Sequence, residues 1–401
     1  MILLRLFLII KFVFIYNLIL AQENCVCKIK YDSKIHDYTF IFQNYIDECD
    51  EIEITQGDYN IYKPLIIREP IRILGVDSAK IIFQDTVGNR QIPKGIFNVK
   101  NHVDIEVKNL NAIGRNNYLI TYLLEPQNNL FINGAVVNVT DNNVHGLGLI
   151  WVGPEKGFTY NRQYGSTYYQ KGDIYSSMEF GEFNILNNNM EGNYSFDNSL
   201  RKKVSAIALL YCSNVVIRYN QIEKYRFGIW LYGGSAYDKS LNTFPCNEIL
   251  VDEIIISANI IHDTHSSIFL SRCSDILITH NFSMNTLDVS FDLEGCLDAR
   301  VECNTSINAS GGSYTLLNNT SNTVVENNIA IQYEDDSDLA RKRVVFIRNN
   351  NNENLYIDNY FEYVGSQTGE IRIDNRLLDD RMDRILFTAN QLHNVEIVYT
   401  R

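Results

Sequence analysis

The segment Cys212–Asn220 reads CSNVVIRYN, and the same nine-residue frame returns as CSDILITHN at Cys273–Asn281 and as CLDARVECN at Cys296–Asn304. Weaker copies are VDEIIISAN at residues 251–259 and TSNTVVENN at residues 320–328. The final Asn residues of the last four frames in chain order are 22, 23 and 24 residues apart. A period of 20–50 residues is typical of a solenoid, in which each unit buries its apolar face only against its neighbours.

Each unit of this repeat is predicted to contain two or three short strands. The frames carry β-branched residues at period two, and a second strand pattern precedes three of them: SAIALLY, SSIFLSR and VSFDLEG. Asn at a fixed point fits a sharp turn because Asn tolerates the left-handed conformation. Stacked Asn side chains could also pair along the axis and satisfy their buried amides. The sequence therefore predicts an all-β, single-stranded right-handed parallel β-helix with a short N-terminal helical cap.

Residues 1–21 are predicted to be a signal peptide that is cleaved after Ala21. Arg5 and Lys11 are its only charges, and it is otherwise apolar. An uncleaved membrane anchor is the alternative, although the run is interrupted and short for a span. No later stretch approaches the roughly 20 apolar residues that a spanning helix needs. We therefore expect an exported chain, secreted or periplasmic, with no membrane span after cleavage.

The charge balance limits the partners of the mature chain. Without Arg5 and Lys11 it carries 33 basic and 48 acidic residues, a formal charge of −15. That balance argues against nucleic-acid binding, which needs a basic surface. It also disfavours an anionic polymer as substrate unless calcium or a local basic patch intervenes. Roughly 380 residues fit one domain, 22–401, and we expect a monomer.

All eight cysteines lie beyond the predicted signal peptide, and an even count in an exported protein permits disulfides. Three of them occupy one position of the repeat and are predicted to stack as a buried ladder rather than to form disulfides: Cys212, Cys273 and Cys296. Another three could supply one N-terminal bridge: Cys25, Cys27 and Cys49. Their spacings match no zinc signature.

The remaining chain divides around the registered coils. An N-terminal cap is expected at about residues 22–50, with a short helix over 37–48 and Asp37 as its N-cap. Residues 153–203 break the period and are predicted to form a long loop excursion. The best-registered coils occupy residues 204–330, and further coils follow an acidic loop that begins at Glu334.

Two stretches resemble a known superfamily. The run ITQGDYNIYKPLIIREPIRILG at residues 54–75 resembles the first coils of exported pectate-lyase-type β-helix proteins, and GIWLYGG at residues 228–234 resembles their repeats. The resemblance covers residues 50–400 at the level of the fold. It implies a polysaccharide lyase, glycoside hydrolase or uronate epimerase with its substrate along the outer groove of one sheet. Neither the polygalacturonase set NTD, DD, GHG and RIK nor an alginate-epimerase DPH is present, so the fold is better supported than any named activity.

Aligning the coils on their final Asn places residues in columns, because successive strand side chains alternate between the two faces. The inward columns are Ile229, Ile268 and Phe291, and Leu231, Leu270 and Leu293. The outward columns are Trp230, Phe269 and Asp292, and Tyr232, Ser271 and Glu294. On the strand LDVSFDLEG, Asp288 and Ser290 are also predicted to point outward, and His265 lies level with Asp288.

Carboxylates beside aromatic rings fit a sugar-binding cleft, and this face allows three chemistries. In a hydrolase, Asp292 and Glu294 would act as the acid and the base or nucleophile. In a lyase or epimerase, His265 would be the base and Tyr232 a proton donor. Arg226, Arg272 and Lys224 could then hold a uronate carboxylate. Alternatively, Asp288 and Asp292 could form a calcium site, catalytic or structural.

Each of these interpretations has a structural alternative. An alternating acidic strand is often only a solvated sheet face, and His265 alone could be a surface histidine. Trp230 and Phe269 could pack beneath the loops at 153–203 or 234–248 instead of under a sugar. The leading hypothesis is an exported carbohydrate-active enzyme that cleaves a polysaccharide by hydrolysis or β-elimination. The alternative function is a non-catalytic β-helix surface or binding protein with a structural acidic or calcium-binding face.

Overall fold

The computed structural model describes most of the chain from Cys25 to Thr400, and the predicted signal peptide lies outside the described residues. The described ranges are 25–84, 94–100, 103–115, 117–124, 135–154, 159–161, 166–168, 182–193, 204–210, 212–233, 252–318, 320–334, 342–348, 353–374 and 385–400. Within these ranges no helix has the length and apolarity that a membrane span requires.

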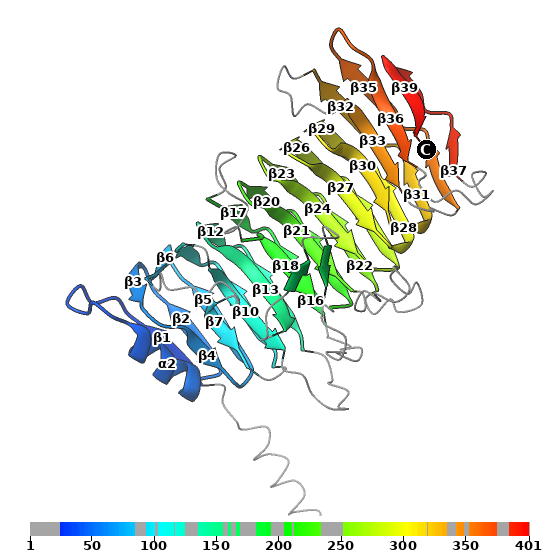
Figure 1. Cartoon of the computed structure of the whole chain (residues 1–401). Helices are drawn as coiled ribbons and strands as arrows, with labels where there is room; N and C mark the ends of the chain where they lie inside the picture. The colour runs from blue at the N-terminus through cyan, green and yellow to red at the C-terminus, as the bar shows by residue number, and fades with distance from the viewer. Residues whose placement is uncertain are drawn as a thin grey trace, which may run out of the picture.

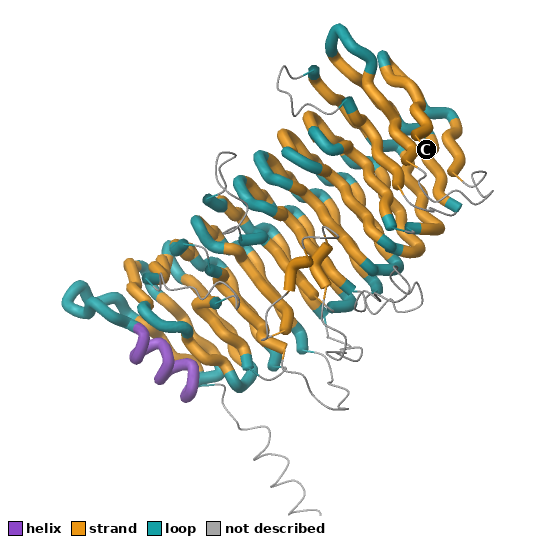
Figure 2. The backbone as a smooth tube through the Cα atoms, viewed as in Figure 1, coloured by secondary structure: helices purple, strands orange, loops and turns teal. Residues whose placement is uncertain are grey.

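The described chain is the predicted right-handed parallel β-helix, built from three long sheets that run along one axis (Figures 1 and 2). Sheet A begins at the N-terminus and consists, in order, of β1 Val26–Ile29, β2 Glu51–Ile54, β5 Ile71–Gly75, β8 Ile105–Lys108, β11 Val137–Thr140, β16 Phe183–Leu186, β19 Val215–Arg218, β22 Ile254–Ser257, β25 Ile276–Thr279, β28 Leu297–Glu302, β31 Ser321–Glu326, β34 Asn354–Ile357 and β37 Ile385–Thr388. The repeated nine-residue frames form strands of this sheet.

Sheet B consists, in the same direction, of β3 Gly57–Ile61, β6 Ala79–Phe83, β9 Asn111–Ile113, β12 Asn143–His145, β17 Asn189–Glu191, β20 Gln221–Glu223, β23 Ile260–His262, β26 Phe282–Thr286, β29 Thr305–Ala309, β32 Ile329–Tyr333, β35 Tyr360–Val364 and β38 Gln391–His393. Sheet C consists of β4 Leu65–Ile67, β7 Gly95–Val99, β10 Tyr118–Leu124, β13 Gly148–Pro154, β18 Ile207–Leu210, β21 Phe227–Tyr232, β24 Ser266–Ser271, β27 Val289–Glu294, β30 Gly312–Leu317, β33 Arg343–Arg348, β36 Gly369–Asp374 and β39 Val395–Thr400. One A–B–C circuit makes one coil, so each coil has three strands.

A ladder of buried Asn side chains holds the A-to-B corner, as the repeat predicts. Asn259 is a typical rung: its Nδ2 donates to Asn281 Oδ1 (2.9 Å) and to the Ile217 carbonyl (3.0 Å), and its Oδ1 accepts from the Asn220 N–H (3.0 Å). The described rungs are Asn142, Asn188, Asn220, Asn259, Asn281, Asn304, Asn328, Asn359 and Asn390. Burial of these amides is tolerated because they are paired along the axis.

The sequence predicts that the Asn itself adopts the left-handed conformation at this corner. In the structure, the residue before the Asn adopts it instead. Ala258, His280 and Cys303 have φ of 54°, 56° and 54°. The corner therefore needs a left-handed turn first and an inward amide second. In the described coils from β11 to β37 the inward residue is Asn while the residue before it varies, and in the coil of β8 Leu110 takes that position.

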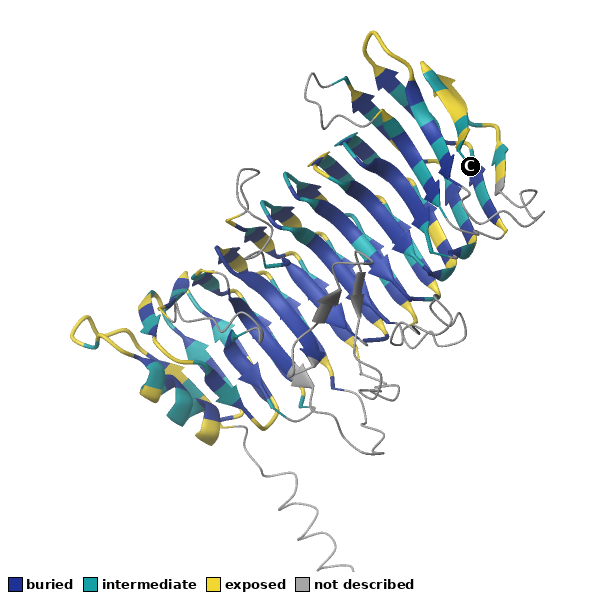
Figure 3. Ribbon diagram, in the orientation of Figure 1, coloured by how far each residue is buried: buried dark blue, intermediate teal, exposed yellow. Residues whose placement is uncertain are grey.

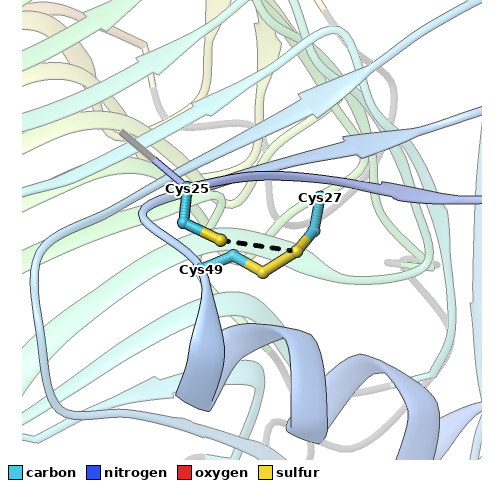
Figure 4. A group of neighbouring side chains, drawn as sticks. All are labelled: Cys25, Cys27 and Cys49. Carbon is cyan, nitrogen blue, oxygen red and sulfur yellow. Dashed lines mark hydrogen bonds between the residues drawn. A yellow bond between two sulfur atoms is a disulfide. The ribbon is translucent and has the colours of Figure 1, made fainter. Parts of the chain in front are cut away.

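The N-terminal cap contains the predicted helix, α2 Thr39–Glu48, which buries Phe42 and Ile46. Its N-cap is Tyr38 and not Asp37, so that prediction is wrong by one residue, although Asp37 Oδ1 still accepts the Thr39 N–H (2.8 Å). Cys27 and Cys49 form the N-terminal disulfide (Figure 4). Cys25 is a free thiol whose Sγ lies 3.9 Å from that of Cys27.

The predicted cysteine ladder is confirmed. Cys212, Cys273 and Cys296 are buried free thiols, and each Sγ donates weakly to a main-chain carbonyl. Burial in apolar surroundings raises the pKa of the Cys212 and Cys273 thiols, which makes them inert packing groups.

The range 153–203 is not one continuous excursion. A hairpin lies inside it, formed by the antiparallel strands β14 Thr159–Asn161 and β15 Ser166–Tyr168. After the hairpin, β16 and β17 restore one coil, with Asn188 as its rung. The sequence FNILNNNME hid this coil because several adjacent Asn residues obscure the frame.

Candidate functional site on the outer face of sheet C

The columns predicted across sheet C are confirmed by the strand registers. Trp230 pairs with Phe269, and Phe269 with Asp292. Tyr232 pairs with Ser271, and Ser271 with Glu294, on the same outer face. Their neighbours Ile268, Phe291 and Leu293 are buried in the solenoid. The coils of β21, β24 and β27 therefore adjoin, and the acidic pair lies directly beside the aromatic column.

Ser290 does not point outward, and that prediction was wrong. Its hydroxyl oxygen accepts from Ser283 Oγ (2.8 Å) and from Ser306 Oγ (2.8 Å) inside the solenoid. The chain bends from sheet B into sheet C here, and the consecutive side chains of Ser290 and Phe291 both lie inside the solenoid, where Phe291 stacks on Tyr314. The strict alternation of side chains therefore holds only from Phe291 onward.

A cluster of aromatic rings covers the sheet on the N-terminal side of Asp292. The two tryptophans of the chain, Trp151 and Trp230, lie with ring centroids 6.0 Å apart. Phe227 lies against Trp230 (5.5 Å) and stacks on Phe269 (5.5 Å). Trp230 is only 8% exposed, whereas Phe269 is half-buried. In this conformation Phe269 presents the more accessible ring, and the loop ranges predicted to cover Trp230 lie largely outside the described residues.

Asp292 is an unusual surface-face carboxylate because it is 7% exposed and its Oδ1 has no hydrogen-bond partner among the described residues. Burial, followed by the neighbouring charges of Glu294 and Asp288, raises the pKa of Asp292 well above its usual range. Thr315 lies in the same column on the next coil, and its buried hydroxyl also lacks a partner within the described part of the chain. Asp292 and Thr315 thus place two buried polar side chains next to each other in one column of the outer face.

Glu294 has a more polar environment than Asp292. Its Oε2 accepts a hydrogen bond from Asn318 Nδ2 (3.1 Å), one coil further on. Burial raises the pKa of Glu294 from 4.5 to about 7, and the Asn318 hydrogen bond and the charges of Arg272 and Arg348 limit that rise. At neutral pH, Glu294 can therefore ionise more readily than Asp292, and the two carboxyls are suited to different roles.

Arg272 is a buried neighbour of this pair rather than an accessible clamp. Its guanidinium lies over Gly295, where an added Cβ would come within 2.8 Å of Arg272 Cζ. Its positive charge lowers the pKa of both Glu294 and Tyr232, although burial still holds the pKa of Tyr232 above its ordinary value. The role predicted for Arg272 in binding a uronate stays a prediction, and in the structure its charge favours the ionised form of Glu294.

His265 and Asp288 form a separate pair at the start of β27, as the predicted register requires. His265 Nδ1 lies 4.0 Å from Asp288 Oδ2 and 3.3 Å from Ser266 Oγ. The His265 ring is also 6.5 Å from that of Phe227. Arg226 lies over the ring of Phe227, with its Cζ 4.9 Å from the Phe227 centroid. Imidazole, carboxylate and guanidinium thus gather at the B-to-C corner, ahead of the Asp292–Glu294 pair.

The described residues do not assemble a ready calcium site at Asp288 and Asp292. The described ranges contain two groups of three metal-ligating side chains whose ligand atoms lie within 4.8 Å of one another, and both lie elsewhere. These are the three N-terminal cysteines and the group Glu223, His262 and Asp263 on sheet B. A calcium ion at Asp288 would need most of its oxygen ligands from water or substrate.

Sequence reasoning missed four residues of this site. Trp151 and Phe227 complete the aromatic cluster, Asn318 binds Glu294, and Arg348 adds positive charge beside it. Asn318 follows Glu294 by one repeat period of 24 residues, a signal that was available in the sequence. Arg348 is two coils away across a loop, so its spacing gave no comparable signal.

Comparisons with known proteins support the fold. The chain is similar to the A-modules of two Azotobacter vinelandii mannuronan C-5 epimerases: AlgE6 (11% identity, TM-score 0.54, 92% of each chain covered) and AlgE4 (12% identity, TM-score 0.50, covering 94% of this chain and 97% of that one). It is also similar to DFA-IIIase from Arthrobacter chlorophenolicus A6 without its lid (13% identity, TM-score 0.48, covering 94% and 90%). No family model and no curated protein sequence matches the chain. The chain therefore shares the fold of the two A-modules, and its three parallel sheets make that fold a right-handed parallel β-helix.

Proposed function

We propose that this protein is an exported carbohydrate-active enzyme that cleaves a polysaccharide bound along the outer face of sheet C. The observation that carries the proposal is the buried Asp292 carboxylate, whose Oδ1 lacks a partner within the described residues and lies between Phe269 and Thr315. A sugar ring can place its C–H face on an aromatic ring and its hydroxyls on such atoms. The mannuronan epimerases share this fold but are too distant in sequence to supply the activity.

In this proposal Asp292 is the general acid and Glu294 the general base. Burial and the charges of Glu294 and Asp288 raise the pKa of Asp292 well above its usual range, which favours the protonated form that can donate a proton to the leaving oxygen. Glu294, with a pKa of about 7, can activate water because Asn318 and two arginines stabilise its charge. Residues two apart on a strand are about 6.6–7 Å apart at their backbones, which favours the wider carboxyl separation of an inverting hydrolase.

The second candidate is β-elimination or epimerisation at the His265–Asp288 pair. The 4.0 Å contact between these side chains favours it, because a carboxylate beside an imidazole supports its role as base. The nearby Arg226 could then neutralise a substrate carboxylate. Both candidates place the substrate on the same face, so one assay can separate hydrolysis from β-elimination, whereas epimerisation, which cleaves no bond of the chain, gives no signal in it.

The test is incubation of the mature protein with a panel of neutral and uronic polysaccharides, with and without calcium. Reducing ends and the ultraviolet absorbance of an unsaturated uronate are followed together. Reducing ends without absorbance support hydrolysis at Asp292 and Glu294, whereas absorbance that rises with reducing ends moves the chemistry to His265. Silence in both assays across the panel contradicts cleavage. Because both tryptophans lie in the aromatic cluster, their fluorescence then reports whether a sugar binds without reaction.

A further inference from the structure

Three cysteines meet at the N-terminal cap, and the disulfide uses only two of them. Cys27 and Cys49 are bonded, whereas Cys25 carries an exposed free thiol. The Cys25 Sγ lies 3.9 Å from that of Cys27, and the three sulfur atoms all lie within 4.8 Å of one another (Figure 4). A nucleophile that the fold holds this close to a bond reacts without a diffusional encounter. The cap therefore holds a thiol in position to attack its own disulfide.

Main-chain hydrogen bonds fix Cys25 beside this disulfide. The Cys25 N–H donates to Asp50 Oδ2 (2.9 Å), and the Cys25 carbonyl accepts the N–H groups of Asp50 (3.0 Å) and Glu51 (3.1 Å). Asp50 directly follows Cys49, so these bonds hold Cys25 next to that cysteine. Figure 3 shows exposed and intermediate residues on β1 and α2, in contrast to the dark blue strands of the middle coils. Solvent thus reaches Cys25, while Cys27 is half-buried and Cys49 is buried.

Cys49 is the better of the two partners for Cys25. Residues two apart on an extended chain have Cα atoms about 6.6–7 Å apart, which is at the upper limit of about 6.8 Å for a disulfide. A bridge from Cys25 to Cys27 would therefore strain the chain. A bridge from Cys25 to Cys49 joins two separate segments, as the observed bridge does. The two bridges to Cys49 close loops of 24 and 22 residues, so the entropy of loop closure favours neither.

We propose that Cys25 exchanges with the disulfide of the cap, so that two alternating bridges close it: Cys27–Cys49 and Cys25–Cys49. In the exchange the Cys25 thiolate attacks Cys49 Sγ, the Cys25–Cys49 bond forms and the Cys27–Cys49 bond breaks. The electron pair of the broken bond leaves on Cys27 Sγ, which takes up the proton that Cys25 released to water. One thiol and one disulfide are present before and after, so no oxidant or reductant is consumed. This site is independent of the proposed catalytic face.

The test locates the free thiol of the cap in the mature protein. The protein is incubated at about pH 8.5 without added thiol or oxidant, so that thiolates form. It is then quenched with acid, unfolded, labelled with N-ethylmaleimide at about pH 5, where exchange is slow, and analysed by tandem mass spectrometry. Label should lie on Cys25 in part of the molecules and on Cys27 in about a tenth or more, because loop closure leaves the two bridges close in free energy. Label confined to Cys25, or label on Cys49, would overturn the proposal. The internal control is the free thiol of Cys303, which should be labelled in every molecule.

Two serine variants form a matched pair, because each removes one of the two competing cysteines. Cys27→Ser should form the Cys25–Cys49 bridge and leave no thiol to label in the cap. It should melt within about 3 °C of Cys25→Ser, since both variants keep a bridge that closes a loop of nearly the same length. Cys25→Ser should show no label on Cys27 at any time of incubation. Two labelled thiols in the cap of Cys27→Ser, or a labelled Cys27 in Cys25→Ser, would contradict the exchange.

Discussion

Replacing Glu294 with Gln is predicted to change how the stability of the protein depends on pH. Burial raises the pKa of Glu294 from 4.5 to about 7, so the folded state binds a proton between these values that the unfolded state has released. The stability that Glu294 gives the protein is therefore complete below about pH 4.5 and is lost as the pH rises to about 7. One pKa unit corresponds to about 1.4 kcal/mol. Because Glu294 is partly exposed, we discount the total loss in the free energy of unfolding to about 2 to 3 kcal/mol.

Gln cannot ionise, so Glu294→Gln should gain about 2 to 3 kcal/mol relative to the wild type between pH 4.5 and pH 8. The measurement is urea denaturation followed by circular dichroism at both pH values, taken as the difference between variant and wild type. Because a protonated Glu and a Gln are both neutral, effects of the substitution that do not depend on pH cancel in that comparison. Glu69→Gln, at an exposed turn, is the control and should give the same difference at both pH values. A pH-independent difference for Glu294→Gln would refute the burial of this carboxyl.

Three further predictions concern the scaffold around the site. Asn259→Ala should lower the free energy of unfolding by about 3 kcal/mol in urea denaturation, because it leaves several buried main-chain and amide groups unpaired, whereas Asn390→Ala in the last coil should cost less. Gly295→Ala should cost about 1 to 2 kcal/mol in the same assay, since φ is +61° and the new Cβ displaces the Arg272 guanidinium. Its pH profile should also show a higher pKa for Glu294. Cys49→Ser removes the disulfide and should lower stability by about 2 to 4 kcal/mol, which thermal denaturation with and without reductant would check.

The columns of sheet C could be predicted because the repeat carries its own register. A rung Asn closes each frame, and the spacing between rungs increases by only one residue from coil to coil in the best coils. Phe269 and Asp292 were therefore aligned correctly. The prediction failed at Ser290, where the corner buries two residues in succession, since period-two alternation assumes a straight strand.

The electrostatics of the site were harder to predict than its register. Adjacent carboxylates at residues 292 and 294 indicated mutual repulsion, but the sequence did not tell which of them would be buried without a partner. That difference depends on Asn318, one coil away, and on Arg272, whose guanidinium folds over Gly295. Side-chain directions of this kind follow from packing between coils rather than from spacing within one strand.

The most direct test of the catalytic face compares Asp292→Asn and Glu294→Gln with the wild type on whichever polysaccharide the panel identifies. Both the rate of cleavage and the melting temperature are measured for each protein. The account predicts that each variant loses activity by about 10²-fold or more while its melting temperature at neutral pH is unchanged or higher. Cleavage at the wild-type rate in both variants, with the same products, would place the chemistry elsewhere on the solenoid.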